Sequence, residues 1–135
     1  MRCYPGGCVV KKIVNNFIFY LGEYFNVYLP KQRNSSKHTI AAARQTWNIL
    51  LLFICKATKK NVGDISFDDL SRKNIISFLD ISETERNWTA ATRNHRLSLI
   101  RSFFSYASAF EGTLAIYSEQ LKTIPLKNIQ INRIF

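Results

Sequence analysis

Apolar side chains recur at helical spacing in five separate segments of this 135-residue chain, and no alternation of period two lasts long enough to predict a strand. The chain has only five glycines and three prolines, which argues against the many turns of an all-β protein. Because 47% of the residues are hydrophobic, the chain can bury a core, which a disordered polycation cannot. The sequence therefore predicts an all-α fold, and its length suits one domain.

The boundaries of the helices follow from residues that cap or interrupt them. Pro30 is expected to stop the first helix, because proline lacks a backbone N–H. Ser36 and Thr89 are expected N-caps, since their hydroxyls accept a free N–H of the first turn. Asp68 or Ser71 is expected to cap the third helix. The expected helices span residues 12–28, 37–57, a short stretch that includes 75–79, 90–110 and 114–121.

The second and fourth helices carry apolar residues at offsets of three, four and seven, the spacing of a buried helix face. The other aromatic and aliphatic residues of the helices are interpreted as core as well. The two apolar stripes are Ile40, Trp47, Leu51 and Ile54, and Leu97, Ile100, Phe104 and Ala107.

The three cysteines do not predict a disulfide framework, because their number is odd and Cys55 lies in an apolar run where a buried free thiol is ordinary. Cys3 and Cys8 could supply two metal ligands, but His38 and His95 lie far along the chain without ligand spacing. No metal, cofactor or small-molecule substrate is therefore expected. Apolar runs of signal-peptide or membrane-span length are absent from the sequence, so the expected location is the cytoplasm, in association with the nucleoid.

The excess of positive charge, +10 for the whole chain, is divided by helix. Residues 31–63 contain seven bases and no acid, residues 64–85 contain six acids and two bases, and residues 86–101 contain four arginines and no acid. Two acid-free basic segments separated by an acidic one suggest that the second and fourth helices share a basic surface. Double-stranded DNA is the commonest partner of such a surface, because its phosphates form a dense array of negative charge.

Two segments carry the most specific sequence signal. Residues 92–104 read TRNHRLSLIRSFF, and residues 36–44 read SKHTIAAAR. The first resembles Thr-x-Asn-Arg-x-Leu-Ser-x-Leu-Arg-x-Phe-Phe, the pattern of the helix that closes the core-binding domain of tyrosine recombinases, the phage-integrase and Xer-like family. The second resembles the same family's Ser-x-x-Thr-Leu-x-x-Tyr-Arg. His95 and Ala43 depart from the two patterns, standing where arginine and tyrosine are usual.

The resemblance covers residues 13–125 and implies a SAM-like bundle of four to five helices that binds one face of a DNA duplex. It implies a core-binding domain at residues 12–125, an N-terminal extension at residues 1–11, and a linker-like or truncated tail at residues 126–135. The chain is thus expected to bind DNA sequence-specifically as one module of a recombinase that acts in DNA integration and recombination.

Candidate DNA-binding residues lie in the two resembling segments. Arg93, Asn94 and Arg96 are expected to face base edges or flanking phosphates, since arginine and asparagine side chains can read the major groove. Phosphate is expected to be held by Lys37, Thr39, Arg44 and Arg101. The full set is Ser36, Lys37, His38, Thr39, Arg44, Thr92, Arg93, Asn94, Arg96 and Arg101.

The resemblance also implies that catalysis needs residues beyond this set. Members of the family cleave DNA with a tyrosine nucleophile assisted by arginines, a lysine and a histidine or tryptophan, all from a C-terminal domain, and several such donors must act on one phosphate. Neither histidine begins a His-x-x-Arg, because Ala41 and Ser98 stand where the arginine is required. Tyr106 and Tyr117 are interpreted as core or rim aromatics. The chain is therefore expected not to be an enzyme by itself.

Two other functions remain open from the sequence. One is a helical protein-interaction module, in which Phe17, Phe19, Tyr20 and Tyr24 dock another recombinase protomer. The other is a small regulator that occupies recombination sites without cutting them. Salt-dependent binding to a duplex separates the DNA-binding functions from the protein-interaction module.

Overall fold

The computed structural model describes residues 16–128, and these residues fall into two compact units that meet in the sequence between Ser71 and Arg72. Helices, and no strands, make up the described residues, so the all-α prediction is confirmed for this part of the chain. The single domain expected over residues 12–125 stays a prediction.

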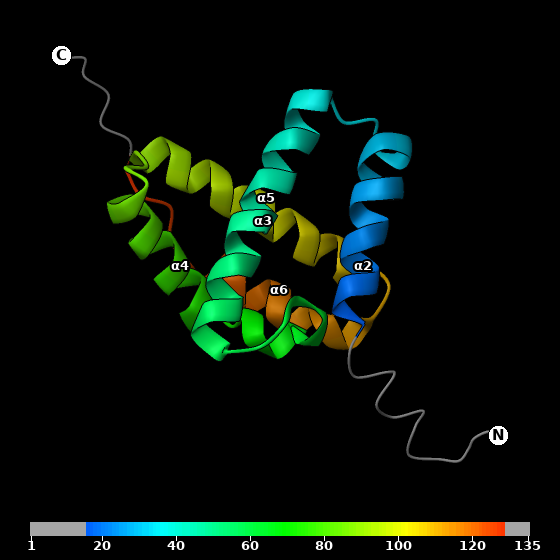
Figure 1. The fold of residues 1–135 in the computed structure, drawn as a ribbon. Coiled ribbons are helices and arrows are strands. Elements are labelled where there is room, and N and C mark those ends of the chain that lie inside the picture. Colours follow the sequence, from blue (N-terminus) through cyan, green and yellow to red (C-terminus); the bar gives the residue numbers. More distant parts are fainter. Residues whose placement is uncertain (1–15, 129–135) are drawn as a thin grey trace. The chain divides into compact units, whose positions relative to one another are not determined.

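The first unit is a helical hairpin followed by two short 3₁₀ helices (Figure 1). Helix α2 (Phe17–Glu23) continues directly as the π-helix η1 (Tyr24–Gln32), and α3 (Lys37–Thr58) runs back beside them. The 3₁₀ helices η2 (Val62–Asp64) and η3 (Phe67–Leu70) follow and pack against α3. One arm of the hairpin is α2 with η1, and the other is α3. The N-terminus of α3 therefore lies next to the loop that connects the two arms.

An aromatic cluster forms the core of this unit. The Phe17 ring centre lies 5.9 Å from that of Trp47 and 5.4 Å, edge to face, from that of Phe67, so it joins α2, α3 and η3. Aromatic pairs at these separations stabilise the fold beyond the area they bury. On α3 the buried residues are Ala43, Thr46, Trp47, Leu50 and Ile54, whereas the predicted stripe positions Ile40 and Leu51 are half-buried.

The prediction that the first helix stops before Pro30 is wrong, because Pro30 lies inside η1. In an α-helix a proline removes a hydrogen bond, and its ring meets the carbonyl four residues back. In η1 the turn is wider, and the Arg33 N–H donates to the Tyr28 carbonyl five residues back, at 2.7 Å. This register accommodates the proline, so the helix ends only at Gln32. The expected start near residue 12 lies outside the described residues.

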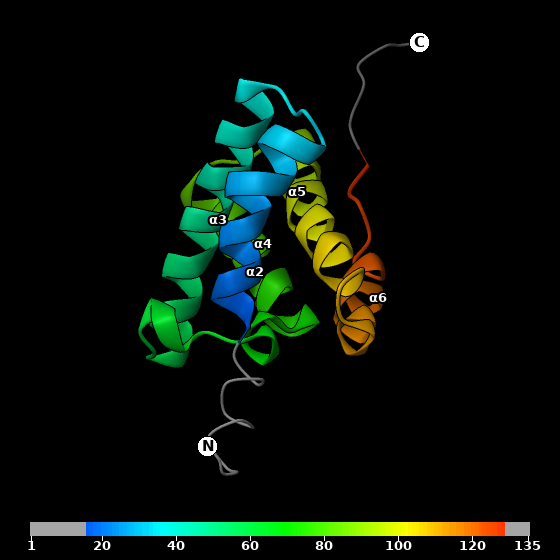
Figure 2. The same ribbon diagram turned by 90° about the vertical axis from the view of Figure 1, so that its right-hand side faces the viewer.

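The described part of the second unit contains three α-helices and one 3₁₀ helix (Figure 2). Helix α4 (Arg72–Glu85) leads through a loop to the long α5 (Ala90–Ser108), and η4 (Gly112–Leu114) turns the chain into α6 (Ala115–Lys122). The chain then runs back along α5 towards its N-terminal end, as the red segment of Figure 2 shows. We call residues 123–128 the returning segment.

Most predicted helix boundaries are confirmed. Ser36 caps α3 and Thr89 caps α5, each accepting a first-turn N–H. Of the two expected caps of α4, Ser71 directly precedes it, whereas Asp68 lies within η3. The predicted stripe of α5 is wholly buried, namely Leu97, Ile100, Phe104 and Ala107.

Residues 16–128 contain no helix that is long and apolar enough to cross a membrane, and no group of metal-ligating side chains comes together among them. Cys55 is a free thiol and is half-buried. Cys3 and Cys8 lie outside the described residues. Tyr106 and Tyr117, interpreted as core or rim aromatics, are both half-buried.

Candidate nucleic-acid interface

Hydroxyl groups alone cap the N-terminus of α3. The Ser36 Oγ accepts the backbone N–H of Thr39 at 3.1 Å and donates to the Thr39 Oγ1 at 3.0 Å. Thr39 occupies the third helical position, where a glutamate or glutamine usually completes a capping box. The first turn contains no acidic residue, so no carboxylate there offsets the partial positive charge of the helix end.

Helix α5 begins in the same way. The Thr89 Oγ1 accepts the Thr92 N–H at 3.1 Å, the two hydroxyls lie 3.2 Å apart, and the first turn again contains no acid. Two residues before each cap stands an asparagine with left-handed backbone, Asn34 (φ 54°) or Asn87 (φ 58°), a conformation that asparagine adopts more readily than most residues. The pattern Asn-x-Ser/Thr-x-x-Thr therefore precedes both helices of the basic segments.

The short helix η3, in the acidic segment, is capped differently. The Asp69 carboxylate accepts the Ser66 N–H at 3.0 Å and pairs with the Lys60 Nζ at 3.0 Å. At the start of η3 a carboxylate thus joins the Ser66 hydroxyl in the capping box, whereas the starts of α3 and α5 have hydroxyls only. The first turn of α4, in the acidic segment, also contains no acid. Helix starts without a carboxylate suit an anion such as phosphate, which accepts the remaining backbone N–H groups.

Exposed basic side chains lie along α3 and in the segments that flank it. Lys37 and His38 lie in its first turn and are exposed, as are Ser36 and Thr39. All seven bases of residues 31–63 are exposed, so the positive charge predicted for this segment lies at the surface of the first unit. These bases are Lys31, Arg33, Lys37, Arg44, Lys56, Lys59 and Lys60.

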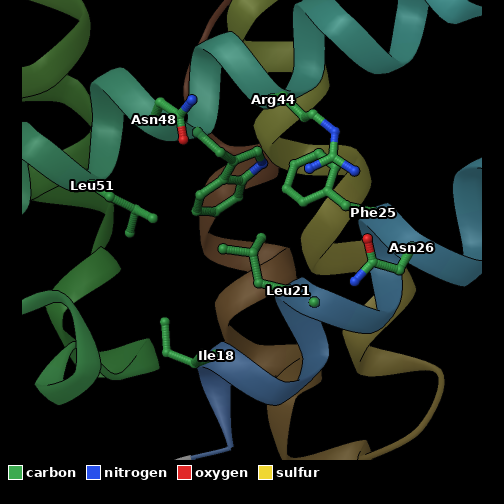
Figure 3. Close-up of a pocket in the computed structure, with 9 residues that line it drawn as sticks. Ile18, Leu21, Phe25, Asn26, Arg44, Asn48 and Leu51 are labelled. Atoms are coloured by element: carbon green, nitrogen blue, oxygen red, sulfur yellow. The ribbon is translucent and has the colours of Figure 1, made fainter.

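Arg44 lies at the edge of a groove between the two arms of the hairpin (Figure 3). Its guanidinium carbon is 5.0 Å from the centre of the Phe25 ring, a cation–π contact that fixes the side chain. At Gly22 an added Cβ would meet nothing within 4 Å, so this glycine helps to keep the groove open. The groove has a volume of about 270 Å³ and is lined by Ile18, Leu21, Gly22, Phe25 and Asn26 from one arm and Arg44, Trp47, Asn48 and Leu51 from the other.

Arg96 rests on an aromatic pair near the start of α5. Its guanidinium carbon lies 5.4 Å from the Trp88 ring centre, and Trp88 packs edge to face on Phe78 of α4 at 5.8 Å. Burial, and next the positive charge of Arg86, lower the pKa of Arg96. The guanidinium nevertheless stays protonated, because arginine is not deprotonated in proteins. The cationic groups of Arg86 and Arg96 are therefore near each other at the N-terminal end of α5. At the same end, Thr92 is half-buried and His95 is exposed.

Three predicted DNA-binding residues are engaged within the second unit instead. Arg93, expected to face base edges or flanking phosphates, is only 4% exposed, and its Nε lies 3.4 Å from the Glu83 Oε1. Asn94 hydrogen-bonds the backbone of Lys127. Arg101 donates to backbone carbonyls at the end of α6, and burial, followed by the charge of Arg93, lowers its pKa.

Sequence reasoning missed Trp88 and Lys127. A signal for Trp88 exists, because it directly precedes a helix cap and stands close in sequence to two arginines that its ring can face. No comparable signal exists for Lys127, whose contact with Asn94 spans 33 residues of sequence and uses backbone atoms.

Residues 23–110 match the protein family described as phage integrase, N-terminal SAM-like domain. The matching region extends from the end of α2 through α5 and includes both hydroxyl-capped helix starts. It covers more than half of the chain, and the SAM-like helical fold implied by the sequence agrees with it.

Two proteins of Sinorhizobium fredii (strain NBRC 101917 / NGR234) are similar in sequence. The chain is 38% identical over 111 residues to "Putative integrase/recombinase y4rD", a match that covers 82% of this chain and 40% of that protein. It is 37% identical over 91 residues to "Putative integrase/recombinase y4rC", covering 67% of this chain and 27% of that protein. The match thus spans less than half the length of either relative. No solved structure was found to match the chain.

The helix start of α3 is testable by stability. Thr39→Glu is expected to stabilise the fold by about 0.3–1 kcal/mol, because a carboxylate at the third helical position completes a capping box and faces the positive end of the helix. Urea unfolding followed by circular dichroism measures the change. Ala57→Glu adds the same charge at the exposed C-terminal end of α3 and is expected to destabilise by a similar amount. If Thr39→Glu instead destabilised the fold, the N-terminal end of α3 would not have an uncompensated positive charge.

Proposed function

This chain belongs to the family of phage integrase N-terminal SAM-like domains, and from that premise we propose that it binds double-stranded DNA as the core-binding module of a site-specific tyrosine recombinase. The names of the two relatives, integrase/recombinase, support a role in DNA integration and recombination. Binding is sequence-specific and takes place on the nucleoid in the cytoplasm.

The proposal is supported above all by the starts of α3 and α5, the long helices of the two basic segments. Hydroxyls cap each start, and neither first turn contains a carboxylate. Backbone N–H groups at such a terminus donate to phosphate oxygens. The exposed Lys37 and His38 add side-chain donors at the start of α3. A carboxylate in either first turn would repel phosphate, and neither turn contains one.

The candidate residues take different parts in this proposal. Ser36, Lys37, His38 and Thr39 hold phosphate at the start of α3, while Arg44 lies further along the same helix. Thr92 and Arg96 act at the start of α5. Because the Trp88 ring already orients the Arg96 guanidinium, little side-chain entropy is lost when Arg96 contacts DNA. That both helix starts face one duplex stays a prediction.

We further propose that this chain by itself binds DNA without cutting it. Cleavage by the family requires several cationic donors around one phosphate and a tyrosine nucleophile. Neither His38 nor His95 begins the His-x-x-Arg that would supply two of those donors.

A second candidate function, docking of another recombinase protomer, is favoured by the groove of Figure 3. Ile18 lines this groove and is 39% exposed, and the neighbouring Phe19 is 65% exposed. Phe17 and Tyr24 do not belong to such a surface, because both are buried in the core. The proposed docking surface therefore excludes Phe17 and Tyr24, which the sequence had suggested, and includes Ile18.

Replacing Lys37 with alanine is expected to weaken binding to all duplexes alike and to reduce the slope of log K against log salt by about 1, because one phosphate contact is lost. Arg96→Ala is expected to cost about 1–3 kcal/mol of specific binding. Both are measured by titrating a fluorescent duplex, selected from a random library by the wild-type chain, at several salt concentrations.

Two further variants control this experiment. Lys122→Ala removes an exposed base outside both basic segments and is expected to leave the salt slope unchanged. Thr39→Glu is expected to weaken binding roughly fivefold at low salt, although it stabilises the fold, because the new carboxylate faces phosphate. Unchanged affinity in Lys37→Ala, Arg96→Ala and Thr39→Glu would contradict the proposed interface.

Incubation with a nicked suicide substrate is expected to give no covalent protein–DNA adduct, since the chain is proposed to bind without chemistry. Denaturing gel electrophoresis with a labelled duplex detects an adduct directly. An adduct, together with its loss in a Tyr106→Phe or Tyr117→Phe variant, would show that the chain cuts DNA.

Gly22→Leu is expected to abolish self-association through the groove while stabilising the fold by about 1 kcal/mol, because leucine favours the helix and its side chain has open space. Sedimentation equilibrium measures the association. Gly22→Ala is the matched control, because it gains similar helix propensity but adds a single methyl group. Equal association of wild type and both variants would refute docking at this groove.

A further inference from the structure

The returning segment, residues 123–128, has no helix or strand of its own, yet it is fixed along α5. Leu121 at the end of α6 and Ile124 are both 1% exposed, so the chain stays packed as it leaves the helix. Figure 2 shows the segment rising beside α5 from the end of α6. Its path therefore follows from specific contacts with α5.

Side chains of α5 bind backbone groups at the end of α6 and in this segment. The Arg101 Nε donates to the Leu121 carbonyl at 3.1 Å, and its Nη2 donates to the carbonyls of Lys122, at 3.4 Å, and of Ile124. The Arg93 Nη1 donates to the Pro125 carbonyl at 3.3 Å. We call Arg93, Asn94 and Arg101 the α5 clasp.

Asn94 forms the tightest part of the α5 clasp. Its Nδ2 donates to the Lys127 carbonyl at 2.8 Å, and its Oδ1 accepts the Lys127 N–H at 2.9 Å. Among side chains of this length only asparagine can both donate and accept in this way, since aspartate lacks a donor when ionised. The amide thus pairs with both backbone groups of one residue.

The spacing of these contacts agrees with an extended segment. Asn94 and Arg101 are separated by two helical turns, or about 10 Å. The three residue-to-residue steps from Ile124 to Lys127 span about 10 Å when extended. The returning segment therefore runs antiparallel to α5, and its residues have the same spacing as the α5 side chains that bind them.

An ion-pair network fixes the far end of the segment. The Lys127 Nζ lies 2.7 Å from the Glu83 Oε1, and the same carboxylate lies 3.4 Å from the Arg93 Nε. The Glu83 side chain is 20% exposed and that of Arg93 is 5% exposed. Lys127 is thus held by its backbone through Asn94 and by its side chain through Glu83.

We propose that Arg93, Asn94 and Arg101 are positioning residues that bind the chain and not DNA. They hold the returning segment along α5, so the segment ends, at Asn128, near the N-terminal end of this helix, and we call this place its exit. That end carries Thr92 and Arg96, so the inference rests on the proposed function where it places the exit beside DNA. The exit then lies next to the bound phosphates.

Amide hydrogen exchange of the full chain, followed by NMR, tests the α5 clasp. Asn94→Ala is expected to accelerate exchange of the Lys127 amide between about fivefold and a hundredfold, because two hydrogen bonds to that residue are lost. The Ile100 amide in the middle of α5 is expected to keep its protection, which separates local release from unfolding. Ser98→Ala, an exposed position on the same helix, is the matched control and is expected to change neither amide.

Unchanged exchange of Lys127 in Asn94→Ala would overturn the clasp, and so would equal acceleration at Lys127 and Ile100. Adding duplex to the wild-type chain separates the two parts of the inference. Lys127 is expected to keep its protection in the complex, whereas faster exchange would show that Asn94 leaves the segment for DNA. Failure to bind duplex would refute the proposed function and the exit beside DNA, while the comparison of variants without DNA still decides the clasp.

Discussion

The backbone N–H groups at the start of a helix must find acceptors, and the group that caps them sets the charge of that helix end. In this chain, hydroxyls alone cap α3 and α5, whereas an aspartate completes the capping box of η3. A carboxylate in the first turn of α3 or α5 would stabilise the helix further, so its absence leaves the positive charge of both helix ends uncompensated.

On helix α5, the side chains of the sequence motif at residues 92–104 have three different roles. Leu97, Ile100 and Phe104 are buried in the core. Asn94 and Arg101 hold the returning segment, and Arg96 rests on Trp88 near the helix start. Arginines of this motif thus have acceptors within the chain, because buried guanidinium groups need acceptors and the chain's own carbonyls supply them.

Local signals predicted most of the fold and part of the site. Ser36 and Thr89 were predictable as caps because a cap depends on residues a few positions apart. Pro30 misled the prediction, because the π register that accommodates it is not encoded by a simple spacing. The tasks of Asn94 and Arg101 were not predictable, since their partners are backbone atoms 20 to 33 residues away, and backbone atoms leave no mark in a sequence.

The returning segment determines where the folded unit physically ends. The family match stops at residue 110, and the last helix stops at Lys122. A fragment cut at either point would keep Arg93 and Arg101 but lose carbonyls that accept from them, and a buried donor left without its acceptor costs about 1–3 kcal/mol. A fragment that keeps every contact of the α5 clasp therefore reaches at least Lys127. Helix content alone would put the boundary of this module too early.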